Sequence, residues 1–209
     1  MTQSNTKYLQ VPYTNDRRQE LIQHIINNIS AKSYLEIGCH MDHTFSIIEC
    51  LHKVGVDPLC GGTIRMSSND FFKENQEIFD VIFVDGLHHY DQVTQDINNA
   101  LACLSDHGFI IVHDMFPIAE TQTLVPKPEN HWGAWLGDVW RAGFDLMARS
   151  DITFKLLAMD SGCGIITKQP QAPKIVKVNP TWDWYKDHWQ ELPVITYNDF
   201  IKSAAYDLM

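Results

Sequence analysis

Short apolar runs alternate with amphipathic segments along most of this chain. The two clearest runs are residues 79–86 (FDVIFVDG) and residues 108–114 (GFIIVHD), which are too uniformly apolar for strands with one face in water. Residues 17–29, in contrast, repeat apolar side chains at helical spacing. Strands that are buried on both faces need helices on both sides. The alternation therefore predicts a parallel α/β sheet with helices covering each face.

The same pattern predicts where most helices and strands lie. We expect strands at residues 34–38, 54–58, 79–86, 108–114, 152–159 and 163–168, with a brief one through Ile64 and Met66. We expect helices at residues 17–29, 44–53, 70–73, 93–104 and 138–148. In the second of these helices the apolar spacing directs four side chains towards the core, those of Phe45, Ile47, Ile48 and Leu51. The last two strands should form a hairpin through residues 160–162.

A chain of 209 residues is long enough for one α/β domain with a substantial core. We place that domain at residues 1–168, with an arm at residues 1–15 and a loop at residues 115–137. A loop this long in a compact domain is usually functional or disordered. Residues 169–209 form an extension with an aromatic cluster, which comprises Trp182, Trp184, Tyr185 and Trp189. Such rings can stack on a sugar, but more often they pack on the domain or form a subunit interface, as in a homo-oligomer.

The net charge argues against two classes of partner, and the cysteine content indicates the redox environment. The formal net charge is −10 at pH 7, and no cluster of Lys and Arg appears, which argues against nucleic acid and anionic membranes. The 5 cysteines show no CxxC spacing, as is typical of reduced thiols. Residues 1–5 lack the apolar segment of a signal peptide, and no apolar run approaches the length of a membrane span. We therefore expect a cytoplasmic protein.

Four of the predicted strands end in acidic residues. These acids, with the histidine beside the last of them, are Glu36, Asp57, Asp85, His113 and Asp114. In parallel α/β sheets, ligands bind beyond the carboxyl ends of the strands, so these side chains should meet at one site. Gly38, directly after the first strand, would let a ligand approach the backbone closely. Asp57 can accept hydrogen bonds from both hydroxyls of a ribose, although a turn residue before Pro58 is the alternative.

Four segments together resemble the ordered motifs of the class I S-adenosylmethionine-dependent methyltransferases: residues 34–38, 55–58, 79–86 and 108–114. The resemblance implies a doubly wound, mostly parallel seven-stranded sheet with an antiparallel closing strand. It also implies that S-adenosylmethionine is bound by residues at the strand ends, namely Glu36, Gly38, Asp57 and Asp85. The first motif of the family is E-x-G-x-x-x-G, and here Asp42 replaces its final glycine. His40, in the same loop, either borders the cofactor or faces solvent.

A narrower resemblance is to the metal-dependent O-methyltransferases of the catechol and macrolide-sugar types. It implies that a divalent metal is held by Asp85, His113 and Asp114. It also implies that His88 is the catalytic base, acting beside Asp85. The segment Ser68-Asn69-Asp70 resembles the part of these enzymes that contacts adenine. For His88 and the adjacent His89, the alternative is a pair of exposed loop histidines.

The chemistry of a hydroxyl acceptor agrees with this resemblance. A bound divalent cation can hold a hydroxyl oxygen and lower its pKa, and a histidine can then take the proton. His113 gives the site an imidazole beside two carboxylates, which suits Mn²⁺, Fe²⁺ or Zn²⁺ better than Mg²⁺. Alternatively, His113 contacts the substrate and no metal is needed.

We therefore expect an O-methyltransferase that acts on a hydroxyl of a small molecule or a carbohydrate. Residues 61–63 and 137–140 also resemble segments of methyltransferases from sugar and polysaccharide pathways. Two other functions stay open: an S-adenosylmethionine-binding protein without turnover, and a metal-dependent hydrolase built on the same acids and histidines.

Overall fold

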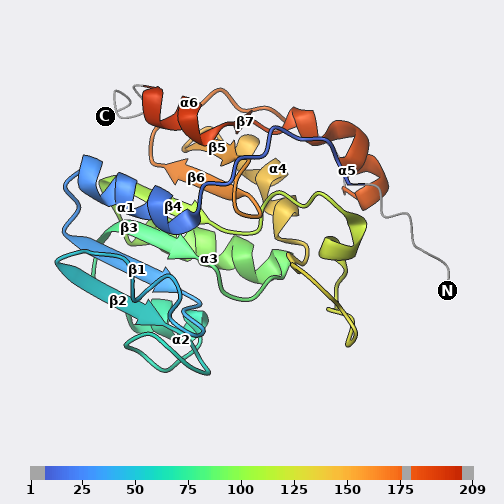
Figure 1. The fold of residues 1–209 in the computed structure, drawn as a ribbon. Coiled ribbons are helices and arrows are strands. Elements are labelled where there is room, and N and C mark those ends of the chain that lie inside the picture. Colours follow the sequence, from blue (N-terminus) through green and yellow to red (C-terminus); the bar gives the residue numbers. More distant parts are fainter. Residues whose placement is uncertain (1–7, 176–179, 204–209) are drawn as a thin grey trace.

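A seven-stranded sheet forms the centre of the computed structural model, which describes residues 8–175 and 180–203 (Figure 1). The strand order is β2-β1-β3-β4-β6-β5-β7. The strands are β1 Ser33–Ile37, β2 His52–Val56, β3 Phe79–Val84, β4 Leu104–Val112, β5 Thr153–Leu157, β6 Cys163–Thr167 and β7 Val194–Ile195. Strand β6 runs antiparallel to both of its neighbours, and the other pairs are parallel. The predicted fold class is confirmed, including its single antiparallel strand.

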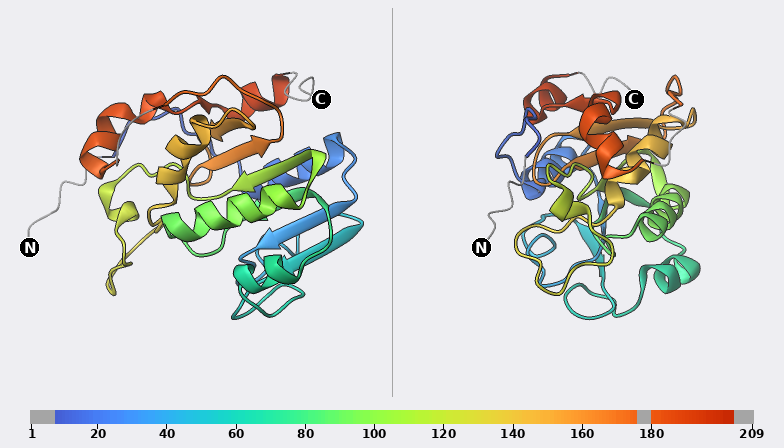
Figure 2. Two further views of the ribbon diagram at one scale, coloured as in Figure 1. Left: turned by 180° about the vertical axis from the view of Figure 1, so that it is seen from behind. Right: turned by 90° about the vertical axis from the view of Figure 1, so that its right-hand side faces the viewer.

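Helices cover both faces of this sheet, as the alternating pattern predicts (Figure 2). The α-helices are α1 Arg18–Asn28, α2 Ser68–Glu74, α3 Tyr90–Ala102, α4 Ala142–Met147, α5 Trp182–His188 and α6 Tyr197–Lys202. Short 3-10 helices are η1 Glu120–Thr123, η2 Val139–Arg141 and η3 Trp189–Glu191. The helices expected at residues 17–29, 70–73 and 93–104 are confirmed. The one expected at residues 138–148 is also present, divided between η2 and α4.

Alternate residues of the central strand β3 enter two separate hydrophobic cores. Val81 and Phe83 lie in the core beneath α1, whereas Ile82 and Val84 lie in the core beneath α3. All four side chains are at most 2% exposed. Because both faces of β3 are covered, its carboxyl end is the natural place for a ligand, beyond the edge of both cores.

The helix expected at residues 44–53 is wrong. This segment forms turns, and β2 begins at His52. Phe45 and Ile48 are buried as expected, but Ile47 is 62% exposed and Leu51 is 85% exposed. The Lys53 ammonium donates to the carbonyls of Phe45 and Ile48, at 2.8 and 2.7 Å. These two carbonyls therefore accept hydrogen bonds from Lys53, although the segment is not helical.

The brief strand expected through Ile64 and Met66 is also wrong. Ile64 forms only an isolated bridge with Val56. The seventh strand is instead β7, from the extension, which pairs with β5 at the opposite edge of the sheet. The hairpin expected through residues 160–162 is present, formed by β5 and β6.

The two terminal segments both lie against the main body. In the extension, Tyr185 is fully buried, and its ring centroid lies 4.6 Å from that of Trp140. In the arm, Thr14 pairs with Met159 in an isolated bridge. Residues 1–7 of the arm lie outside the described residues, as do 176–179 and 204–209. Within the described parts of the chain, no helix has both the length and the apolar character that a membrane crossing requires.

Candidate active site

A cavity of about 770 Å³ opens at the carboxyl ends of β1, β2, β3 and β4. Of the residues that the sequence singled out for cofactor, metal or proton transfer, all but Asp70 line it. These residues are Glu36, Gly38, His40, Asp57, Ser68, Asn69, Asp85, His88, His113 and Asp114. The topology explains this convergence, because parallel strands bring their carboxyl ends to one edge of the sheet.

Gly38 lets the ends of β1 and β3 approach each other at the floor of the cavity. Its φ is +90°, in the region that favours glycine. A Cβ atom at this position would lie 2.1 Å from the carbonyl oxygen of Asp85. Only glycine can therefore occupy this position without displacing the β3 end that carries Asp85.

Asp42 takes over the role of a glycine in the loop that follows. Its φ of +63° lies in the left-handed region, which Asp tolerates better than most residues. Its Oδ1 accepts a hydrogen bond from the backbone N–H of Gly62 at 2.7 Å. Asp42 therefore keeps the positive φ that a glycine would have at this position of the motif. It also adds a hydrogen bond to the turn at residues 61–63.

Asp57 is held at the end of β2 by backbone N–H donors. Oδ2 accepts from His40 at 2.9 Å, and Oδ1 accepts from Leu59 at 2.8 Å and from Cys60 at 2.9 Å. Burial alone would raise the pKa of this carboxyl, but the donors hold it below its usual range. The ionised Oδ2 can accept further hydrogen bonds, as a ribose would require.

Ser68 and Asn69 begin α2 on the same wall of the cavity. The side-chain amide of Gln92, on α3, donates to Ser68 Oγ at 3.3 Å and to Asn69 Oδ1 at 3.0 Å. Gln92 therefore fixes both residues at the cavity wall.

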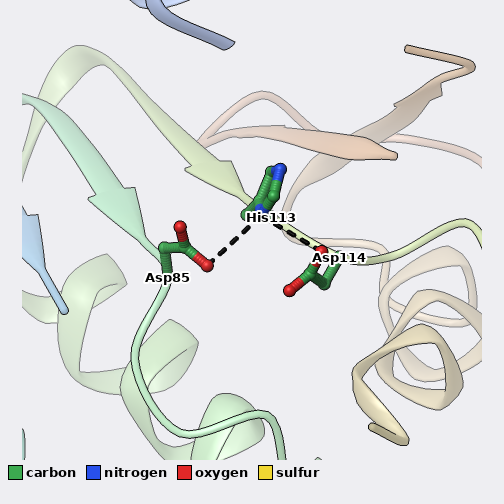
Figure 3. Close-up of side chains that lie close together, drawn as sticks. All are labelled: Asp85, His113 and Asp114. Atoms are coloured by element: carbon green, nitrogen blue, oxygen red, sulfur yellow. Dashed lines mark hydrogen bonds and ion pairs between the residues drawn. The ribbon is translucent and has the colours of Figure 1, made fainter. Parts of the chain in front are cut away.

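A cluster of two carboxylates and one imidazole lies at the ends of β3 and β4 (Figure 3). His113 Nδ1 lies 3.2 Å from Asp85 Oδ1 and 3.2 Å from Asp114 Oδ1. His113 and Asp114 are buried, at 7% and 5% exposure. One atom from each of the three residues lies within 4.8 Å of the others.

This cluster fits a divalent cation. Ligand atoms that each bind one cation at about 2.0–2.2 Å stand roughly 3 Å apart, as the imidazole nitrogen and the carboxylate oxygens do here. The donor set of two carboxylates and one imidazole favours a transition metal over Mg²⁺.

His88 lies beside the cluster, with one ring nitrogen near Asp114 and the other near Asp85. Its Nδ1 lies 2.9 Å from the carbonyl oxygen of Trp135 and 3.0 Å from Asp114 Oδ2. Both neighbours are acceptors, so we assign the proton of the neutral ring to Nδ1. Nε2, which lies 3.6 Å from Asp85 Oδ1, is then the basic nitrogen.

Charge coupling sets the protonation of these groups. Burial would raise the pKa of the Asp85 carboxyl, but the charge of His113 and hydrogen bonds from both histidines hold it well below its usual range. Burial would lower the pKa of His113, but Asp85 and Asp114 raise it well above the usual value. For His88, the nearby carboxylates of Asp85 and Asp114 likewise outweigh burial and raise the pKa.

Comparison with known proteins shows what this arrangement is similar to. Solved structures share the fold at low identity. An O-methyltransferase from Bacillus cereus, in complex with SAH, is 14% identical, with a TM-score of 0.53 over 77% of this chain and 84% of that one. TomG from Streptomyces achromogenes, an O-methyltransferase in complex with SAM, is 15% identical, with a TM-score of 0.51 over 72% and 79%. The SAH-bound methyltransferase PaMTH1 from Podospora anserina is 18% identical, with a TM-score of 0.51 over 74% and 80%.

The sequence itself adds a further similarity. Residues 35–115 match a family model described as a methyltransferase domain. This span runs from β1 to just beyond β4 and carries all four acidic strand ends. The sequence match covers 81 of the 209 residues, and the fold is one that solved methyltransferases share. No curated protein matches the sequence.

Two further charged residues, which the sequence did not single out, line the cavity. Arg18, the first residue of α1, donates from Nη1 to Asp160 Oδ2 at 3.1 Å, and its backbone N–H donates to the same oxygen at 2.9 Å. Asp160 Oδ1 lies 3.6 Å from His113 Nε2. Burial would raise the pKa of Asp160, but His113 and Arg18 lower it to about 2.

The pair also explains how His113 is held. Its Nδ1 faces the other two members of the cluster, and its Nε2 faces Asp160. Ligand histidines in metal sites are commonly oriented by a carboxylate in this way. No local signal could have found the pair, since 142 positions separate Arg18 from Asp160.

One part of the loop at residues 115–137 reaches the cavity. The Trp135 ring stacks on His88, with centroids 5.1 Å apart and planes inclined by 13°. Lys127 and Trp135 both line the cavity. The loop at residues 115–137 was expected to be either functional or disordered, and its length and prolines alone do not indicate that Lys127 faces the cavity.

Proposed function

We propose that this domain transfers a methyl group from S-adenosylmethionine to a hydroxyl of a small molecule or sugar, with His88 as general base and a divalent metal at the cluster of Asp85, His113 and Asp114. One observation carries the proposal. The basic nitrogen of His88 and the three candidate metal ligands converge on the same wall of the cavity that holds the candidate cofactor residues.

In this proposal each candidate cofactor residue contacts a different part of S-adenosylmethionine. Asp57 accepts hydrogen bonds from the ribose, and Ser68 and Asn69 border the adenine. Gly38 and His40 lie by the methionine moiety, and Glu36 lies beneath them. When bound, S-adenosylmethionine supplies a methyl group on a positively charged sulfur. The similar proteins from Bacillus cereus and Streptomyces achromogenes were solved with SAH and SAM.

His88 then removes the proton of the acceptor hydroxyl at Nε2. As the oxygen forms its bond to the methyl carbon, the carbon–sulfur bond breaks and the electron pair stays on sulfur. Asp114 and the Trp135 carbonyl hold Nδ1–H, so they orient the ring and stabilise the charge that it gains. Asp85 lies at the same end and keeps its carboxylate towards the acceptor.

A divalent metal at the cluster would hold the acceptor oxygen and lower the pKa of its hydroxyl. Asp85 and Asp114 supply two charged ligands, and His113 supplies a neutral one. Asp160 and Arg18 keep the His113 ring in place from behind.

The test is a turnover assay with S-adenosylmethionine on a panel of phenols and sugars that bear neighbouring hydroxyls, with Mn²⁺, with Mg²⁺ and with chelator. We expect turnover that chelator abolishes and Mn²⁺ restores. His88→Ala should keep cofactor affinity and lose at least about 100-fold in turnover, as is typical for loss of a general base. The matched control is His107→Ala, an exposed histidine remote from the cavity.

Two results would contradict the proposal. Unchanged turnover in His88→Ala would remove this residue as the base. The absence of a thermal shift with S-adenosylhomocysteine would remove the cofactor, because a hundredfold excess over the dissociation constant should stabilise the protein by about 2.7 kcal/mol.

A further inference from the structure

The loop at residues 115–137, hereafter the lid, is fastened as a unit over the cavity. The backbone carbonyl of Gln122 accepts from Leu136 at 2.9 Å and from Gly137 at 3.1 Å. The Gln122 side chain accepts from Ile118 at 2.8 Å, and Leu136 is fully buried. Internal bonds of this kind give the lid a defined surface towards the cavity.

That surface consists of one indole ring with two different neighbours. Trp135 Nε1 donates to the Leu124 carbonyl at 2.7 Å, which fixes the ring in the lid. His88, the proposed base, stacks on this ring. The ammonium of Lys127 lies 5.4 Å from the ring centroid. The proposed base and a cation therefore both contact the same indole ring.

Lys127 differs in its charge environment from the other Lys or Arg side chain at the cavity. Arg18 lies 3.1 Å from Asp160 and 4.0 Å from Asp85. Lys127, in contrast, has no carboxylate within salt-bridge distance among the described residues, and its contact is with Trp135. It is exposed and free to meet an anion.

The rest of the cavity wall is strongly acidic. Its acidic residues are Glu36, Asp57, Asp85, Asp114 and Asp160. At the inner wall the one Arg that lines the cavity, Arg18, is already paired with Asp160, so among the described residues this wall offers an anion no unpaired Lys or Arg. At the lid it would meet Lys127 instead. A molecule with a hydroxyl at one end and an anionic group at the other would therefore enter with its hydroxyl towards His88.

We propose that Lys127 and Trp135 form a lid subsite that selects hydroxyl acceptors bearing an oxyanion, either a carboxylate or a phosphate. Lys127 pairs with the oxyanion, and the Trp135 ring holds both Lys127 and His88 at the cavity wall. The subsite rests on the proposed function, because its role is to place the acceptor hydroxyl at His88.

The test uses calorimetric titration of protein saturated with S-adenosylhomocysteine. Two matched probe pairs differ in the anionic group: 3,4-dihydroxybenzoate with 3,4-dihydroxybenzamide, and glucose 6-phosphate with glucose. In at least one pair the anionic probe should bind about tenfold more tightly, in line with a hydrogen bond to a charged group. Lys127→Met should abolish this preference and Lys127→Arg should keep it. Lys155→Met, an exposed lysine outside the cavity, is the control and should leave it unchanged.

Each adverse result has its own meaning. Three results would overturn the subsite in a protein that binds S-adenosylhomocysteine: no preference in either probe pair, no binding of any probe, or a preference that persists in Lys127→Met. In each of these cases the proposed function stands. If the protein does not bind S-adenosylhomocysteine, the proposed function fails and the subsite fails with it.

Discussion

Glu36 is a buried acid at the β1 end of the cavity. Its side chain is 1% exposed, and the Tyr34 hydroxyl donates to Oε2 at 2.5 Å. Burial raises the pKa of Glu36 to about 8, although the bond from Tyr34 opposes the shift. In the protein without cofactor, Glu36 is therefore largely protonated at neutral pH.

This shift predicts a pH-dependent stability. A carboxyl whose pKa is higher in the folded state stabilises the fold at low pH, and this contribution is lost as pH rises from about 4.5 towards about 8. Between pH 5 and 8, urea titrations should show the free energy of unfolding falling more steeply in the wild type than in Glu36→Gln, by on the order of a few kcal/mol. Glu74→Gln, at an exposed site, should follow the wild type. Parallel curves for wild type and Glu36→Gln would contradict the shift.

Gly38 permits a second prediction at this scale, because Gly133 is a matched control. Both have positive φ, +90° and +92°, but a Cβ at Gly133 meets nothing within 4 Å. Gly133→Ala should cost about 1 kcal/mol of stability, from backbone strain alone. Gly38→Ala should cost more than about 3 kcal/mol, because the Asp85 carbonyl must move. Equal losses in chemical denaturation would show that the two strand ends do not depend on this approach.

At the scale of elements, Asp160 joins the start of α1 to the β5–β6 turn. A carboxylate at a helix N-terminus is favourable, and here it also pairs with Arg18 and lies near His113. Asp160→Asn should therefore lower the free energy of unfolding by about 1–3 kcal/mol at neutral pH. The exposed pair of Asp151 with Arg149 is the comparison, and Asp151→Asn should change stability very little. A loss in Asp160→Asn no larger than that in Asp151→Asn would contradict the linking role.

The elements that could be located from the sequence are those in which the spacing of apolar residues fits only one type of secondary structure. The run at residues 79–86 is apolar on both faces, and β3 lies there. Residues 44–53 have a helical spacing too, but only Phe45 and Ile48 pack inwards, and Lys53 ties their carbonyls from β2. Tertiary contacts override local spacing in that segment. Strand β7 has only two residues and depends on β5 as its partner, so no pattern of its own marks it.

At the scale of the molecule, the extension contributes to the main core through Tyr185. This side chain is fully buried and packs with Trp140 and Trp182. Tyr185→Ala should cost about 3–5 kcal/mol, as is typical for large-to-small changes of buried aromatics. Tyr185→Phe keeps the ring and should keep most of the stability. If Tyr185→Ala unfolds at the same urea concentration as the wild type, the extension does not stabilise the domain.

The same scale explains how much of the site could be read from the sequence. Asp57, Asp85 and Asp114 were found because one topological rule brings strand ends together. Arg18 and Asp160 come from a helix start and a hairpin turn far apart in sequence, and Trp135 comes from a long loop. Their positions depend on how the connections pack, which no local pattern encodes.

The central claim is that one cavity holds the cofactor with its sulfur towards His88 and Asp85. A crystal structure of the protein grown with S-adenosylhomocysteine and Mn²⁺ tests it most directly. We predict a ribose hydrogen-bonded to Asp57, a sulfur atom facing His88, and a metal ion bound by Asp85, His113 and Asp114. A ligand bound elsewhere, or in this cavity with its adenine towards His88, would contradict the account.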